Sequence, residues 1–144
     1  MTFNRKWLVL AIRYVLGAIF IYSAYAKLQD PRGFADSIYN YRVFGLIISN
    51  WSAVFVPPLE LVMGILLITG KWLEESFLLT FVLYLIFNVM IIQALIRGLD
   101  ISCGCFSPSN SGPVDFTKII ENLFLTSLVI LGYFQHKQYS IPAK

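Results

Sequence analysis

Four long apolar runs constrain the fold of this 144-residue chain more than any other feature. They cover residues 7–26, 52–69, 77–96 and 116–134. Each is close to the roughly 20 apolar residues that an α-helix needs to cross a bilayer. The third run carries no charge, whereas Lys118 and Glu121 lie in the first turns of the fourth. We predict an all-α polytopic membrane protein, a bundle of four transmembrane helices that forms one domain over residues 1–144.

The composition excludes several other classes of protein. Charged residues are 13% of the chain and mean hydropathy is +0.71, whereas an ordinary soluble domain has about a quarter charged residues. A soluble globular enzyme is therefore excluded. The net charge is only +3, and the basic residues are spread along the chain, so we expect no nucleic-acid partner. A single histidine, His136, excludes a bis-histidine haem within one chain and a histidine-rich zinc site.

The segment between the first two runs has a helical pattern of its own. Phe34, Ile38 and Tyr41 recur at helical spacing, beside polar residues such as Asp36. We expect a short interfacial helix over residues 34–49.

Four spans place both termini on one side of the membrane. The basic residues flanking the spans are nearly balanced, and Arg13, nearer the N-terminal end, favours cytoplasmic termini in the inner (plasma) membrane. The loop that holds Cys103 and Cys105 then faces outward, where disulfides persist. Because Arg13 interrupts the first run, we expect that run to be a span and not a cleaved signal.

Arg13 and Glu60 lie inside the first two predicted spans and Lys27 directly follows the first, where a charge is costly unless it is paired. Arg13 and Lys27 share one face of the first span with Gly17, and Glu60 shares a face of the second with Gly64. Glycines on such faces allow two helices to approach closely. We therefore expect a salt bridge from Glu60 to Arg13 or to Lys27. This salt bridge either holds the two helices together or binds a quinone or an anionic substrate.

The remaining polar residues of the spans have simpler explanations. In the third span, Asn88 and Gln93, with Arg97 one turn beyond, are expected to make interhelical hydrogen bonds. Aromatic residues near the span ends are expected to be interfacial anchors: Trp7, Trp51, Trp72 and Tyr133.

The only two cysteines of the chain form a Cys103-Gly104-Cys105 motif between the last two spans. A disulfide between them closes a small, strained ring, for which Gly104 supplies backbone freedom. Strain favours a labile, exchange-competent disulfide, and closing so short a loop adds little stability. Arg97, if it lies nearby, would lower the pKa of a thiol. The motif predicts a redox-active dithiol.

Two alternatives remain for this pair of cysteines. Two thiolates could hold a soft metal such as copper(I), although no methionine or histidine nearby completes such a site. The cysteines could also be incidental. We predict no metal site.

Three short motifs carry a resemblance that extends over nearly the whole chain. They are Arg13-x3-Gly17-x5-Ser23-x3-Lys27, Pro57-Pro58-Leu59-Glu60-x3-Gly64, and Cys103-Gly104-Cys105-Phe106 with Asn122 at the start of the last apolar run. The first two resemble DoxX-type membrane proteins, and the third resembles the MauE branch of that superfamily.

The resemblance implies a four-helix bundle related to quinone-linked thiol oxidoreductases of the vitamin K epoxide reductase type. The MauE branch is associated with methylamine utilisation, and the resemblance implies a role in maturing the disulfide-rich small subunit of methylamine dehydrogenase. For this chain it implies thiol–disulfide exchange through Cys103 and Cys105. The implied partner is thioredoxin-like or another extracytoplasmic client, and a quinone is the candidate cofactor. Arg13, Lys27 and Glu60 would form the polar core.

The chain departs from this pattern in two ways. Ser107 stands where the MauE pattern usually has glycine, and no second cysteine pair is present to form an internal relay. Electrons would have to pass directly between the pair and a partner or a quinone. Two rival functions remain. One is a non-catalytic or copper-holding scaffold subunit, and the other is a DoxX-type quinone-reducing subunit that acts through Glu60 and Arg13.

Overall fold

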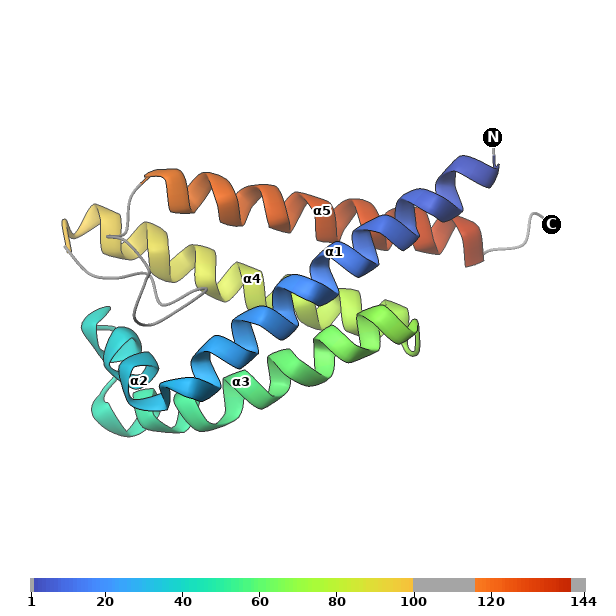
Figure 1. Cartoon of the computed structure of the whole chain (residues 1–144). Coiled ribbons are helices and arrows are strands. Elements are labelled where there is room, and N and C mark those ends of the chain that lie inside the picture. Colours follow the sequence, from blue (N-terminus) through green and yellow to red (C-terminus); the bar gives the residue numbers. More distant parts are fainter. Residues whose placement is uncertain (1, 100–115, 141–144) are drawn as a thin grey trace.

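The computed structural model describes residues 2–99 and 116–140, all of whose regular structure is helical. Five helices follow in order: α1 (Thr2–Gln29), α2 (Pro31–Asn40), α3 (Leu46–Thr69), α4 (Leu73–Ile96) and α5 (Phe116–Ser140). Figure 1 shows the four long helices side by side, with the short α2 at one end. The predicted all-α fold is confirmed.

Four of these helices are long and apolar enough to cross a membrane. The candidate spans are Lys6–Gln29, Leu46–Thr69, Leu73–Ile96 and Phe116–Gln138. The chain is thus a multi-pass membrane protein. The helices are longer than the predicted apolar runs, because polar residues at the ends of those runs also adopt helical structure. In α4, for example, Glu74 and Glu75 lie in the first turn, where negative charge favours the helix dipole.

The interfacial helix is shorter than predicted. It ends at Asn40, and residues 46–49 belong to α3. The start of α2 is fixed by Asp30, whose side chain accepts a hydrogen bond of 3.0 Å from the backbone N–H of Gly33. After α2 the chain turns through Arg42, whose φ of 53° lies in the left-handed region and cannot continue a helix. The periodicity of residues 34–49 therefore spans two helices and the turn between them.

The arrangement of the helices gives the bundle two different ends. α1 packs along α3 and α4 packs along α5, while α2 lies against α3. The N-terminal end of α1 and the C-terminal end of α5 lie at one end of the bundle, and α2 lies at the other (Figure 1). α4 ends and α5 begins at the α2 end. The two helix ends that flank residues 100–115 therefore lie on the side of α2.

Apolar side chains cover both the inside and the outside of the bundle. Leu16, Met63 and Phe77 are fully buried, whereas Val62 and Val89 are more than half exposed. In a water-soluble bundle the outer face would be polar. This distribution is the one expected where the outer face contacts lipid.

α1 and α3 approach closely at two glycines. A Cβ atom on Gly17 would lie 2.9 Å from the carbonyl oxygen of Gly64, and a Cβ on Gly64 would lie 2.9 Å from that of Gly17. Side chains larger than hydrogen would force the helices apart. The expected close contact between the two glycine-bearing faces is therefore present, and it sets the distance across which the charged residues must meet.

Candidate functional site

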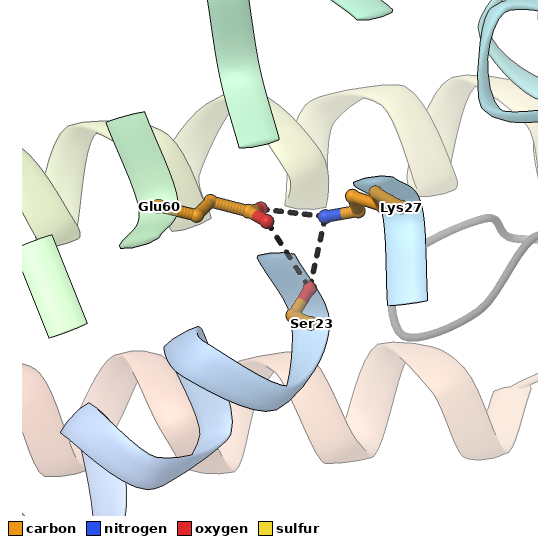
Figure 2. Close-up of polar contacts among 3 residues, drawn as sticks. All are labelled: Ser23, Lys27 and Glu60. Atoms are coloured by element: carbon orange, nitrogen blue, oxygen red, sulfur yellow. Dashed lines mark hydrogen bonds and ion pairs between the residues drawn. The ribbon is translucent and has the colours of Figure 1, made fainter. Parts of the chain in front are cut away.

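An ion pair between α1 and α3 lies inside the bundle. Lys27 Nζ is 2.5 Å from Glu60 Oε1, and the side chains of the two residues are 0% and 3% exposed. Figure 2 shows the two side chains extending toward each other from the two helices. Of the two partners expected for Glu60, the structure selects Lys27.

Ser23 closes this contact into a network of three residues (Figure 2). It lies one helical turn before Lys27, and its hydroxyl oxygen accepts a 3.0 Å hydrogen bond from Lys27 Nζ. The same hydroxyl lies 3.3 Å from Glu60 Oε2, to which it donates. Both carboxylate oxygens and the ammonium thus have polar partners, as charges within the membrane require.

Two aromatic rings cover the ammonium group. Lys27 Nζ lies 4.9 Å from the ring centroid of Phe34 on α2 and 5.1 Å from that of Phe87 on α4. Both distances fall within the range of a cation–π contact. Lys27 therefore connects α1 to α2, α3 and α4. Phe34 was expected only on an apolar helical face, and Phe87 was not predicted, because nothing in the spacing of Phe87 distinguishes it from other apolar residues of the span.

Arg13 has a different role from the one considered for it. Its Nε donates to the carbonyl oxygen of Leu67 at 2.8 Å, and its Nη2 donates to that of Ile68 at 3.0 Å. These carbonyls belong to the last turn of α3, where backbone acceptors have no partner within the helix and a cation is favourable. The geometry does not bring Arg13 to Glu60.

A small cavity adjoins the ion pair between α1, α3, α4 and α5. Its polar lining consists of Ser23, Glu60, Tyr84 and Asn122, and the rest of its wall is apolar. About 20 Å³ of it is open to the centres of water molecules. A space of this size holds about one water molecule.

Asn88 joins α4 to α5, as expected of a polar residue in this span. Its Nδ2 donates to Thr126 Oγ1 at 3.0 Å and to the carbonyl oxygen of Tyr84 at 2.9 Å. The Thr126 hydroxyl in turn donates to the carbonyl oxygen of Asn122 at 2.7 Å. The link between the two helices is therefore a short chain of hydrogen bonds.

The expectation for Gln93 was wrong, because its partner lies on its own helix. With the amide oxygen facing the guanidinium of Arg97, Gln93 accepts from Nη1 at 2.5 Å and from Nε at 3.3 Å. Arg97 Nη1 also donates to the carbonyl oxygen of Arg42 at 3.2 Å. These contacts tie the end of α4 to the turn between α2 and α3.

Cys103 and Cys105 lie outside the described residues, so a contact between Arg97 and either thiol stays a prediction. Among the residues that the structure describes, no cluster of three or more His, Cys, Asp or Glu side chains could hold a metal ion.

Comparison with known proteins identifies the family. The profile of the family described as methylamine utilisation protein MauE matches residues 5–135. The chain belongs to the MauE family. The match includes the Lys27–Glu60 pair as well as the Cys103-Gly104-Cys105 motif. The relation of this MauE-family protein to DoxX proteins stays a prediction.

A curated relative is similar over most of the chain. It is the "Methylamine utilization protein MauE" of Paracoccus denitrificans, 27% identical over 121 residues, which are 83% of this chain and 65% of the relative. The chain thus spans slightly less than two thirds of the length of that protein. No solved structure matches this MauE-family chain.

Proposed function

We propose that this MauE-family protein supports thiol–disulfide exchange, or the maturation of an extracytoplasmic partner protein, through Cys103 and Cys105. The observation that carries the proposal is the Cys103-Gly104-Cys105 motif itself, which holds both cysteines of the chain within the family match. A disulfide that closes so short a loop adds little to the stability of the fold, so stability does not explain the spacing of the two cysteines. A labile disulfide explains it.

Thiol–disulfide exchange transfers two electrons and two protons from the client to the Cys103–Cys105 pair. A client thiolate attacks one sulfur of the Cys103–Cys105 disulfide, forms a mixed disulfide and releases the other cysteine as a thiolate. The second client thiolate then attacks the mixed disulfide. The client leaves with a new disulfide, and the pair retains two electrons and, at neutral pH, the protons of two thiols. A thioredoxin-like partner in its disulfide form restores the pair by the reverse steps.

The physiological setting is proposed from the relative, and the client from the family resemblance. The Paracoccus protein is named for methylamine utilisation, and we propose the same physiological setting for this chain. The client would then be a disulfide-rich subunit of methylamine dehydrogenase. We place the protein in the inner membrane with both termini in the cytoplasm, so that the cysteines and α2 are on the outer side.

Single cysteine variants test the exchange. With one cysteine replaced, the remaining thiolate attacks the disulfide of the thioredoxin-like partner, displaces one partner cysteine as a thiolate, and has no second cysteine to release the mixed disulfide. Cys103→Ser and Cys105→Ser should each be examined on non-reducing gels of membranes from cells growing on methylamine, with Ser107→Ala as control. We expect a band linked to the thioredoxin-like partner for at least one single variant, none for the double variant, and loss of client oxidation in the double variant.

The same variants distinguish a scaffold from an exchange protein. A scaffold without thiol chemistry would keep client oxidation and partner binding after both cysteines are replaced by serine. That result would contradict the proposal. The third function considered, quinone reduction through Glu60 and Arg13, gains no support from the geometry, because Arg13 contacts the end of α3 and not Glu60.

A further inference from the structure

An apolar groove lies between α4 and α5. It encloses about 330 Å³, a volume within the range of about 300–1,000 Å³ that is usual for small-molecule sites. Every residue that lines it is aromatic or aliphatic. The wall includes three residues of α4 and three of α5: Phe77, Leu78, Phe81, Val129, Ile130 and Tyr133.

The floor of the groove belongs to the packed interior, whereas its rim faces the surroundings of the bundle. Phe77 and Val129 are 0% and 1% exposed, but Leu78 at the rim is 60% exposed. A Cβ atom on Gly132 would lie 2.7 Å from Cε1 of Phe77, so the glycine lets this ring lie directly against α5. The groove is therefore a fixed hollow in the outer surface that contacts lipid.

The groove lies in the half of the bundle that holds the N-terminal end of α4 and the C-terminal end of α5 (Figure 1). Val129 lies eight residues before Lys137 on α5, and Phe81 lies eight residues after Leu73 at the start of α4. Each separation is about 12 Å along a helix axis. One leaflet contributes about 15 Å of hydrocarbon to the bilayer core. The groove therefore has the depth that one acyl chain occupies.

Two opposite charges lie at the mouth of the groove, one on each helix. Lys137 follows Ile130 and Tyr133 on one face of α5, and its Nζ lies 5.8 Å from the ring centroid of Tyr133. Glu74 lies one turn before Leu78, on the face of α4 that lines the groove. Both residues are exposed, and neither has an ion-pair partner among the described residues.

A phospholipid with an amino head group has parts that match each of these features. An acyl chain fits an apolar groove of this depth, a phosphate accepts hydrogen bonds from a lysine, and an ammonium donates to a carboxylate. A head group that has a phosphate but no ammonium would leave Glu74 without a partner.

We propose that this groove binds one molecule of phosphatidylethanolamine from the leaflet on the side of the chain termini. One acyl chain lies against Phe77 and Val129, the phosphate accepts from Lys137, and the ammonium donates to Glu74. The inference does not rest on the thiol chemistry, because the groove lies at the end of the bundle away from the helix ends that flank the cysteines.

Native mass spectrometry of the full-length protein tests the inference. The protein is released from mixed micelles that contain equal amounts of phosphatidylethanolamine, phosphatidylglycerol and phosphatidylcholine, and the retained lipids are identified by mass. We expect one phospholipid per chain. Phosphatidylethanolamine should be preferred roughly fivefold over phosphatidylglycerol, the effect of one charge at a membrane surface. It should also be preferred over phosphatidylcholine, whose ammonium has no N–H to donate.

Three variants separate the parts of the site. Lys137→Gln should lower the retention of all three lipids about fivefold, because each of them carries a phosphate. Glu74→Gln should remove the preference for phosphatidylethanolamine and leave the retention of phosphatidylglycerol unchanged. Ile130→Trp, which places a large ring in the groove, should lower the retention of every lipid tenfold or more. The two charge variants keep the test available if Ile130→Trp does not fold.

Matched controls alter the same kinds of residue outside the groove. Lys71→Gln and Glu75→Gln remove exposed charges at the same end of the bundle, and Val89→Trp adds a large ring at a 60% exposed position of α4. Each control should retain lipid like the wild type. Four results would overturn the proposal: no retained phospholipid, retained detergent only, equal retention of the three lipids by the wild type, or a lipid-free dimer that assigns the groove to a second copy of the chain.

Discussion

Lys27 on α1 and Glu60 on α3 form an ion pair of 2.5 Å that is closed to solvent. The aromatic rings of Phe34 and Phe87 cover the same ammonium. One side chain thus fixes the positions of four helices relative to one another. Because a buried ion pair is a weak source of stability compared with apolar packing, its main physical effect is to penalise any arrangement that separates the two charges.

Removing one charge of this pair should destabilise the protein strongly. Lys27→Met or Glu60→Gln leaves the other charge buried and unpaired, at a cost of about 3–5 kcal/mol. Replacing both residues, as in Lys27→Met with Glu60→Leu, should recover most of that loss. The loss and the recovery are measured as the free energies of unfolding of these variants in mixed micelles.

A second ion pair provides the control for that experiment. Lys118 and Glu121, 2.9 Å apart on α5, are 25% and 43% exposed. Glu121→Gln should cost no more than about 1 kcal/mol. A double variant of Lys27 and Glu60 that is as unstable as the sum of the single variants would show that the two charges do not act as a pair.

The glycines between α1 and α3 should not tolerate a methyl group. In Gly17→Ala and Gly64→Ala the new Cβ would meet the carbonyl oxygen of the facing helix at 2.9 Å, and we expect a loss of about 1–3 kcal/mol of unfolding free energy. Gly45 has open space around its Cβ position and an ordinary φ of −72°. Gly45→Ala should therefore stay within about 0.5 kcal/mol of wild type. Equal stability of all three variants would contradict the close approach.

The hydrogen bond between Asn88 and Thr126 should contribute modestly to the free energy of unfolding. Interhelical bonds of this kind in membrane bundles average about 0.6 kcal/mol, with a maximum near 1.7 kcal/mol. A double-mutant cycle with Asn88→Leu and Thr126→Val should return a coupling energy in that range. Asn88→Leu paired with Ser127→Ala should give none, because Ser127 bonds to its own helix. Coupling of equal size in both cycles would refute the assignment.

Tyr41, in the turn after α2, should make the protein sensitive to high pH. Burial raises the pKa of its hydroxyl from 10.0 to about 12, so the unfolded chain loses this proton at lower pH than the folded protein. The stability it contributes is complete below pH 10 and is lost as pH rises toward 12, at up to about 1.4 kcal/mol per pH unit. Melting curves across this window should therefore fall more steeply for wild type than for Tyr41→Phe. Tyr39→Phe, at an exposed position, should follow wild type; parallel curves for wild type and Tyr41→Phe would disprove the effect.

The spans and the membrane class could be predicted from the sequence because they depend on hydropathy summed over many residues. The helix boundaries depended on single residues. Asp30 begins α2 through a capping hydrogen bond, and the left-handed Arg42 ends the helical path before Gly45, the N-cap of α3. A continuous apolar periodicity does not reveal such a break, so residues 34–49 were assigned to one helix.

The residues of the candidate site could be predicted from their helical spacing, whereas their contacts with one another could not. Helical spacing placed Lys27 on the inner face and Glu60 beside Gly64, but the choice between Lys27 and Arg13 depends on the depth of each residue along α3. Arg13 meets the last turn of that helix at Leu67, whereas Glu60 lies two turns earlier. Phe87 could not have been identified at all, since its role arises only from the tertiary contact of its ring with the Lys27 ammonium.

The redox state of Cys103 and Cys105 tests the central claim most directly. Full-length protein is equilibrated across a series of thiol–disulfide buffers, free thiols are alkylated, and the fraction of disulfide is measured by mass. We predict one reversible disulfide whose potential is more oxidising than about −300 mV, the range below which structural disulfides lie. Failure to form any disulfide, or thiols protected from alkylation only when copper is present, would contradict thiol–disulfide exchange.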